Sequence, residues 1–211
     1  MKGFIFGAMA LSAIAGSSMG AVRTINFDTD SSGNGIADLT EINTQYNGWG
    51  VNFTPNAFSG GSWATNTTLH ATNSDYGAGY NPSLGNVLHA FDTDWLNEDG
   101  DPSFVMSFAT GITTFQMDVI GDTGGVDGYE TFASFYDAGL NLLGSVSCNG
   151  IGGIETISAA GFGTAYYVAI APGEYLDWVG IDNITYTEAV PAPSALALLG
   201  LGGLVAGRRR R

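Results

Sequence analysis

The chain has 211 residues and is strongly acidic, with twenty Asp and Glu against six Lys and Arg and a formal net charge of −14 at pH 7. Arg23 is the only basic residue between residues 21 and 188, where all twenty acids lie. Because such a surface cannot neutralise phosphates, the composition excludes nucleic acid as a partner. The single cysteine, Cys148, excludes an internal disulfide and is expected to be a small buried hydrophobe.

Residues 1–20 have the layout of a secretory signal peptide. Lys2 supplies a short positive start, residues 3–15 are apolar, and small residues lead up to Gly20. We therefore expect export, with cleavage by signal peptidase just before or after Ala21. The same residues take no part in the folded domain.

Residues 21–188 are long enough for one domain with a core, and they read as short strands separated by Gly, Asn and Asp turns. No window of twelve residues has helical periodicity. Residues 54–80, rich in Gly, Ser, Thr and Asn, are expected to form a long loop or short edge strands. The pattern predicts an all-β protein, an antiparallel β-sandwich of jelly-roll type. The expected strands are 24–28, 45–53, 86–91, 103–109, 112–120, 130–137, 142–148, 153–158, 165–170 and 178–187, with a turn at Thr110 and Gly111.

Residues 30–41 match the spacing of a twelve-residue calcium loop, with Gly35 at position 6. They resemble the loops of EF-hand-like, dockerin and thrombospondin type 3 proteins. A polar turn between two strands is the simpler interpretation, because Gly and Asn are also turn residues. If calcium binds, the oxygen ligands are expected from Asp30, Ser32, Asn34, Asp38 and Glu41, and from the backbone carbonyl of Ile36.

Asp28 and Asp182 are an alternative candidate pair for binding calcium. In a jelly roll the first and last strands often lie side by side. Asp28 ends the first expected strand, and Asp182 lies in the last. The outline is similar to carbohydrate-binding sandwiches that hold a structural calcium near their termini. A solvent-facing or turn-capping Asp182 is the competing interpretation.

Catalytic patterns are weak in this chain. Asp122, Thr123 and Gly124 match the triplet of aspartic proteases, but catalysis needs two such aspartates, and a glycine-rich hairpin turn explains the triplet better. No sequence motif links Cys148 to His70 or His89, the only histidines. No pair of carboxylates stands out for glycoside hydrolysis. We expect a protein that is not an enzyme.

Aromatic residues in or beside loops offer flat rings that can stack on sugar faces. Ordinary use in the core or as loop anchors is the competing interpretation, and it applies above all to Trp178. The candidates for sugar stacking are Trp49, Trp63, Tyr76, Tyr80 and Trp95.

The last residues, 189–211, form a tail in three parts. Val190, Pro191, Ala192 and Pro193 make a stiff spacer, residues 194–207 are apolar and uncharged, and Arg208, Arg209, Arg210 and Arg211 end the chain. As a helix the apolar part spans about 21 Å, shorter than a ~30 Å hydrocarbon core. Arginines that snorkel and stay on the cytoplasmic side complete a transmembrane anchor.

This tail resembles a PEP-CTERM sorting signal, with Ala192 where the usual motif has Glu. The resemblance implies recognition by an exosortase, a membrane protease, and delivery to the cell envelope or to extracellular polysaccharide. It covers about a tenth of the chain and transfers no activity to the domain.

Three functions remain open for residues 21–188. The first is a non-catalytic binding or structural module of the envelope or extracellular matrix, associated with polysaccharide. The second is a secreted glycoside-active hydrolase on a jelly-roll or concanavalin-like fold. The third is a surface-layer subunit that assembles by pairing of edge strands.

Overall fold

The computed structural model describes residues 20–55, 68–73, 85–91, 103–122, 130–172 and 179–190. These residues form antiparallel strands and one short 3-10 helix, η1 (Asn47–Trp49), and the described ranges contain no α-helix. The expectation of an all-β, antiparallel fold is thereby confirmed.

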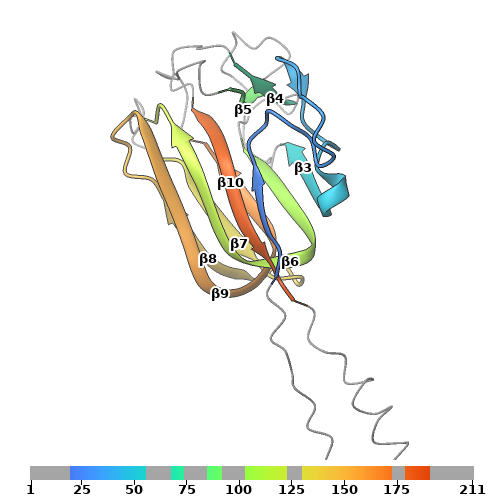
Figure 1. Ribbon diagram of the computed structural model, residues 1–211. Coiled ribbons are helices and arrows are strands. Elements are labelled where there is room, and N and C mark those ends of the chain that lie inside the picture. The colour runs from blue at the N-terminus through green and yellow to red at the C-terminus, as the bar shows by residue number, and fades with distance from the viewer. Residues whose placement is uncertain are drawn as a thin grey trace, which may run out of the picture.

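Ten strands form one antiparallel sheet that folds over on itself (Figure 1). Their order is β2-β4-β5-β10-β6-β9-β7-β8, with β1 beside β10 and β3 beside β6. The strands are β1 (Val22–Ile25), β2 (Thr40–Glu41), β3 (Val51–Pro55), β4 (Thr68–Thr72), β5 (Val87–Phe91), β6 (Phe104–Ile120), β7 (Phe132–Tyr136), β8 (Leu142–Ser147), β9 (Ile154–Ala171) and β10 (Gly180–Glu188).

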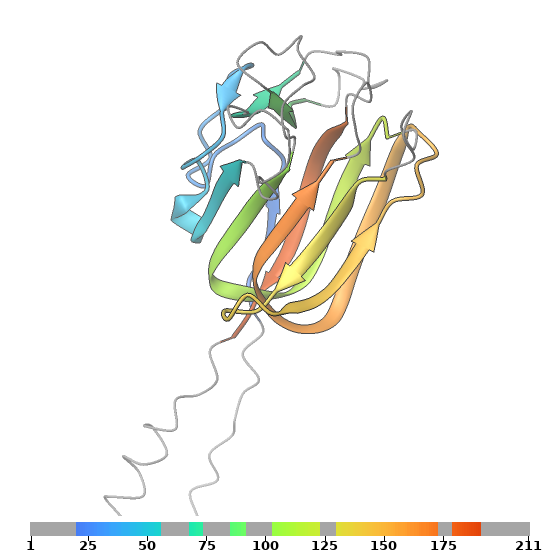
Figure 2. The same cartoon turned by 180° about the vertical axis from the view of Figure 1, so that it is seen from behind.

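Two long strands, β6 and β9, carry the sheet around the core. The first part of β6 pairs with β3 and its second part with β10. Both long strands bend where their pairing is irregular, near Gly111 (φ 71°) in β6 and Gly161 (φ 75°) in β9. Figures 1 and 2 show the resulting two layers, one around β10 and one around β7. The sequence had suggested a strand break at each bend, and that expectation was wrong, because both strands continue through their bends.

Aromatic side chains fill the space between the layers. Phe115 of β6 lies 5.4 Å from Phe135 of β7, measured between ring centroids, and Phe135 stacks on Phe162 at 4.5 Å. Phe108 meets Tyr186 of β10 at 5.0 Å. Burial of each such ring contributes about 1.5–3 kcal/mol, so these contacts hold the two layers together.

Two short strands, β4 and β3, differ from what the sequence pattern predicted. β4 lies inside the polar stretch 54–80 and pairs with β2 on one side and β5 on the other. The expected strand 45–53 begins instead with η1, which ends at Gly50 in the left-handed conformation (φ 70°). β3 starts only after that turn.

The first and last strands are neighbours, as expected. β1 pairs with β10 from Val22 opposite Thr187 to Ile25 opposite Ile184. The backbone N–H of Glu188 donates to the carbonyl of Ala21 at 2.8 Å, so both ends of the described domain leave the same end of the sandwich. No helix among the described residues is long and apolar enough to cross a membrane. Nearly all of the signal peptide (residues 1–19) and the tail from Pro191 onward lie outside those residues.

Candidate functional site

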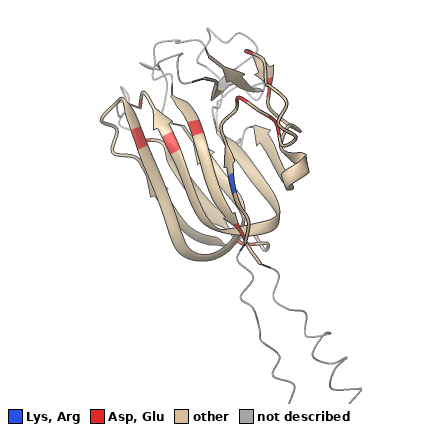
Figure 3. Ribbon diagram, viewed as in Figure 1, with Lys and Arg blue, Asp and Glu red and all other residues tan. Residues whose placement is uncertain are grey.

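The described acidic residues lie mainly toward the end of the sandwich that is remote from Gly20 and Val190 (Figure 3). Arg23 is the only Lys or Arg in the described ranges, and its Nε atom lies 3.0 Å from Glu188 Oε1. Its guanidinium also covers the ring of Trp49, 5.4 Å from the centroid. The one described cationic side chain is therefore engaged near the chain ends.

The first half of the predicted calcium loop is a self-contained turn. Asp30 Oδ1 accepts hydrogen bonds from the backbone N–H groups of Ser32 (2.8 Å) and Asn34 (2.9 Å). Asn34 Nδ2 donates to Asp30 Oδ2 at 2.9 Å. These donors, the Asn34 side chain foremost, lower the pKa of Asp30. The carboxylate is thus occupied by protein groups.

The second half of the loop turns toward β4 and β5. Asp38 Oδ1 accepts from Thr72 Oγ1 at 2.9 Å, and Glu41 lies in β2 opposite His70. The carbonyl of Ile36 accepts from Asn86 Nδ2 at 2.9 Å. Among the described residues, no three Asp, Glu, His or Cys side chains are grouped to hold a metal ion. The oxygen atoms of the loop therefore accept hydrogen bonds from protein groups and do not converge on one ion position. Calcium binding by the loop stays a prediction.

Asp28 lies just beyond β1, after a residue in the left-handed conformation, Phe27 (φ 57°). Its Oδ1 atom accepts from the backbone N–H of Asn86 at 2.8 Å. A Cβ atom at Gly85 would come within 2.5 Å of both Asp28 carboxylate oxygens. Gly85 is therefore required for the close approach of the Asp28 carboxylate to the start of β5.

Asp182 lies in β10, directly opposite Asp118 of β6, and is only 5% exposed. The pairing shifts after it, where Asn183 takes a left-handed conformation (φ 48°) and donates its backbone N–H to Asp182 Oδ1 at 2.7 Å. Burial raises the pKa of Asp182 to about 7, and the negative charges of Asp28 and Asp118 add to the rise. The structure thus brings Asp28 and Asp182 within electrostatic reach of each other.

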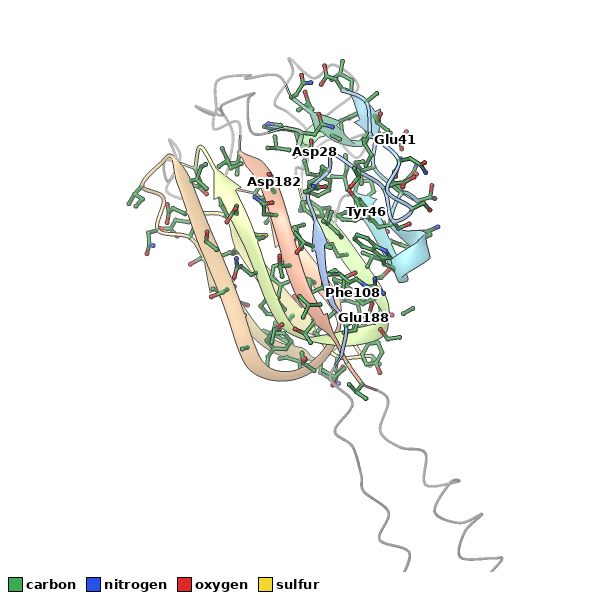
Figure 4. The ribbon with its side chains drawn as sticks, in the orientation of Figure 1. Asp28, Glu41, Tyr46, Phe108, Asp182 and Glu188 are labelled. Atoms are coloured by element: carbon green, nitrogen blue, oxygen red, sulfur yellow. The ribbon has the colours of Figure 1, made fainter. Side chains whose placement is uncertain are left out.

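Tyr46 completes this region and was not singled out by the sequence. Its side chain is fully buried, and its hydroxyl has no hydrogen-bond partner of good geometry within the described part of the chain. Burial raises its pKa, and the nearby backbone of Phe27 opposes only part of that rise. The charges of Asp182, Asp28 and Asp30 raise the pKa further. Figure 4 shows Asp28, Asp182 and Tyr46 in the same part of the sandwich, away from the chain ends.

Cys148 is buried, as expected, and forms part of a polar cluster inside the fold. Its Sγ atom donates to Asp122 Oδ2 at 3.1 Å, and the backbone N–H of Thr131 donates to the same oxygen at 2.7 Å. Burial and this contact with Asp122 raise the pKa of Cys148 to about 12, so the thiol stays protonated and is a poor nucleophile. The Asp122 carboxylate anchors these neighbours, while Thr123 and Gly124 lie outside the described residues.

The two histidines meet across neighbouring strands, a pairing that no local motif indicated. His70 of β4 lies opposite His89 of β5. Strand register brings together residues nineteen positions apart, so only the long-range pairing of β4 and β5 reveals this contact.

Of the aromatic candidates for sugar stacking, Trp49 is the one that the structure describes. Its ring lies 5.8 Å from Tyr46 and under the Arg23 guanidinium, so it helps to pack the domain. The other candidates, Trp63, Tyr76, Tyr80 and Trp95, lie outside the described residues, as does Trp178.

The sheet has a polar outer face that sequence reasoning missed. Thr24, Thr185, Gln116 and Ser158 lie opposite one another in a row across β1, β10, β6 and β9. The hydroxyls of Thr24 and Thr185 are hydrogen-bonded at 2.9 Å. Four adjacent strands span about 14 Å, and the row presents hydroxyl and amide groups without a charge.

Neither a family model nor a curated protein matches the chain. Among solved structures, it is similar to a cleaved adhesin domain of Lys-gingipain, with 18% identity and a TM-score of 0.38, covering 79% of this chain and 99% of that one. Another such adhesin domain, from Porphyromonas gingivalis, shares 14% identity at a TM-score of 0.33, covering 79% of this chain and 98% of the other.

The chain is also similar to part of a Clostridium thermocellum endo-1,4-beta-D-xylanase 10B, whose CBM22-1 and GH10 modules were crystallised with xylohexaose. The identity is 17% and the TM-score 0.36, covering 75% of this chain and 29% of the xylanase chain. With TM-scores below 0.5, these three likenesses are too distant to assign a function to this chain.

Proposed function

We propose that this chain is an exported, non-catalytic β-sandwich of jelly-roll type that binds polysaccharide in the cell envelope or extracellular matrix. The signal-peptide pattern of residues 1–20 and the PEP-CTERM-like tail from Val190 to Arg211 support export followed by sorting through an exosortase-like protease. Membrane anchoring through the tail precedes delivery to the cell surface or the extracellular matrix.

The observation that carries the binding role is the row of uncharged polar side chains across β1, β10, β6 and β9 that runs through Thr185 and Gln116. Sugar hydroxyls both donate and accept hydrogen bonds, and the Thr, Gln and Ser side chains of this row do the same. The domain has one base against twenty acids and so repels anionic polymers. A neutral polysaccharide is therefore the favoured ligand.

The positions of the two ends of the described domain are compatible with a polar row that stays exposed when the tail is anchored. Gly20 and Val190 leave from one end of the sandwich, beside the paired ends of β1 and β10. A domain held by its tail therefore keeps the polar face and the opposite end free of the attachment point.

The binding role is tested by affinity electrophoresis of the exported protein in gels that contain a neutral β-glucan. We expect retardation, which the pair of changes Gln116→Leu and Thr185→Val abolishes by removing the polar groups. Ser145→Val is the matched control on exposed β8 and leaves retardation unchanged. A protein that no neutral polysaccharide retards would overturn the proposal, and release of reducing sugar would replace it with the hydrolase.

The sorting role is tested by fusing residues 190–211 to a secreted reporter. We expect membrane retention of the fusion, and its loss when Arg208, Arg209, Arg210 and Arg211 are replaced by Ser, because the charges that stop transfer are gone. A reporter that is never membrane-associated at any stage would contradict this part of the proposal.

A further inference from the structure

Four exposed apolar side chains lie at the end of the sandwich from which both chain ends leave. Val22 begins β1 and is 65% exposed, and Val190 follows β10 and is 38% exposed. Leu140, in the turn between β7 and β8, is 67% exposed, and Leu142, which begins β8, is 60% exposed. Exposed apolar side chains of this size, gathered at one end, indicate a surface that meets a partner.

Strand pairing places the turn between β7 and β8 at this end. Tyr136, the last residue of β7, lies opposite Tyr167 of β9. Two positions earlier in β9, Ala165 lies opposite Ile112 of β6, and Ile112 lies opposite Glu188 at the end of β10. Figure 2 shows the turn beside the bends of the two long strands, close to where the chain ends leave.

Leu140 is held in the left-handed conformation (φ 62°), which strains a residue that has a Cβ atom. The turn at residues 30–34 has the same bonds between its first residue, Asp, and its fifth, Asn, and it has Gly33 at the matching position. A glycine would therefore fit here without strain, and the largely exposed leucine side chain gains little from packing in the domain. A strained residue that the fold does not require points to a contact outside the domain.

The same end of the sandwich carries little charge. The bends, residues 109–112 of β6 and 160–164 of β9, contain no charged residue. Glu188 is paired with Arg23, which leaves Asp137 as the unpaired acid among the described residues of this end. Most of the described acids lie toward the opposite end (Figure 3). This end can therefore approach an apolar or negatively charged surface at a lower electrostatic cost than the other end.

The tail brings a lipid surface to this end in the proposed function. Residues 190–193 separate the domain from the apolar stretch 194–207. Four residues reach at most about 14 Å even when they are fully extended. Once residues 194–207 lie in the bilayer, the end that carries Leu140 faces the lipid headgroups, and an apolar side chain there gains free energy by leaving water.

We propose that this end of the sandwich docks onto the membrane that holds the tail, with Leu140 and Leu142 inserted at the boundary between headgroups and acyl chains. The inference rests on the anchoring step of the proposed function and adds an orientation to it. The domain stands upright on the bilayer, with its acidic end pointing away and the polar row exposed at the side. The charged carboxylate of Asp137 limits the depth, because it stays among the headgroups and water.

Fluorescence of the full-length chain, reconstituted through its tail in phosphatidylcholine vesicles, tests the docking. Leu142→Cys carries an environment-sensitive nitrobenzoxadiazole label while Leu140 stays in place. The native Cys148 does not compete for the label, because it is buried and burial raises its pKa to about 12. We expect emission at shorter wavelength and quenching by a spin label placed just below the lipid headgroups.

The matched control is the same label on Ile151→Cys. Ile151 is 77% exposed and lies between β8 and β9 at the remote end, close to where Ile154 pairs with Ile120. We expect this label to keep the emission of an aqueous environment and to stay unquenched.

Leu140→Gly, made in the chain labelled at position 142, separates docking from folding. It removes the apolar side chain and the backbone strain together, so we expect most of the quenching to be lost while the melting temperature does not fall. A purely structural role for Leu140 would lower the melting temperature and overturn the proposal. Quenching that Leu140→Gly leaves unchanged also overturns it, since the tether alone then holds the label near the lipid.

Flotation of the same vesicles distinguishes failure of anchoring from failure of docking. A chain that does not float with the lipid contradicts the anchoring step of the proposed function, and the docking is overturned with it. A chain that floats, but whose label at position 142 behaves like the label at position 151, overturns the docking alone. An emission shift that disappears when the amount of lipid per chain is raised assigns this end to contact with a second copy of the chain, and it overturns the proposal as well.

Discussion

The turns at residues 30–34 and 137–141 are held by the same hydrogen bonds. In each, the aspartate Oδ1 accepts backbone N–H groups two and four residues later, and the Asn at the fifth position donates its side-chain amide to the aspartate. The backbone N–H of the aspartate also donates to the carbonyl of that Asn. In both turns the fourth residue is left-handed, Gly33 at φ 82° and Leu140 at φ 62°.

The two turns differ in the residues that come after them. The first opens the stretch that matched a calcium loop, whereas the second joins β7 to β8 and leads into Leu142 and Leu143, without the later ligands of such a loop. The Asp and Asn spacing is therefore explained by turn formation alone. Hydrogen bonds lower the pKa of Asp137 as they lower that of Asp30, whereas burial raises the pKa of Asp182. The surroundings, and not the residue type, decide how each carboxylate behaves.

The largest expected effect is on the pH dependence of stability, and it comes from the buried carboxylate of Asp182. Asp182 has a raised pKa of about 7 in the folded state, so the folded state retains a proton that the unfolded state releases as the pH rises from about 4. Without metal, the contribution of Asp182 to the free energy of unfolding is therefore largest below pH 4 and falls toward pH 7, by up to about 4 kcal/mol. Urea unfolding in EDTA across this range measures the slope.

Asp182→Asn is expected to remove this part of the slope, because an amide does not titrate. The difference between the two proteins isolates Asp182 from other titrating groups such as His70. Asp118→Asn, which keeps Asp182, retains a downward slope. Equal slopes for the parent chain and Asp182→Asn would contradict the prediction.

A smaller effect is expected from exchanging the left-handed residues of the two turns. Leu140→Gly relieves the steric strain of a side chain at positive φ and raises the free energy of unfolding by up to about 1 kcal/mol. Gly33→Ala introduces that strain and lowers the free energy of unfolding by about 1 kcal/mol. The loss is not larger, because no atom lies within 4 Å of the added Cβ and no clash is added. Urea midpoints of the two variants should therefore move in opposite directions, and a shift in the same direction would contradict a shared geometry.

The smallest effect is expected from removing the two turn carboxylates. Asp30→Ala and Asp137→Ala each delete the same acceptors in an exposed turn, so both should lower the melting temperature slightly and by a similar amount in EDTA. Repeating the melts in millimolar Ca²⁺ sharpens the comparison. An Asp30→Ala loss that grows with Ca²⁺, while the Asp137→Ala loss does not, would assign an ion to the 30–41 loop.

The local sequence pattern was sufficient to predict the fold class, but it did not predict which strands continue through a glycine. Alternating residues marked strands such as β7 and β8 correctly, because each is short and bounded by turn residues. Gly111 suggested a turn, but it lies at a bend within β6, whose continuation depends on pairing with β3, β10 and β9. Glycine permits a turn and a bend alike, so only the distant partners distinguish the two.

The candidate site was also predictable only in part, because most of its neighbours come together through long-range pairing. Adjacency of the first and last strands placed Asp28 and Asp182 in one region, and the β1–β10 pairing confirms that adjacency. Tyr46 was not predictable as a residue that the charges of Asp28 and Asp182 influence, because it precedes η1 and comes near them only when the domain packs. The polar outer face was also hidden, since Thr24, Gln116 and Ser158 become neighbours only through register.

The position of β10 bears on how the domain would carry load. β10 ends next to Val190, where the proposed tail begins, and it is hydrogen-bonded to β1 on one side and β6 on the other. A pull from the tail against a ligand held on the outer face of β1, β6 and β9 runs along the axis of β10. Its backbone hydrogen bonds are then sheared together instead of being opened one after another. An anchor attached at this strand suits a domain that must resist tension between a membrane and an extracellular polymer.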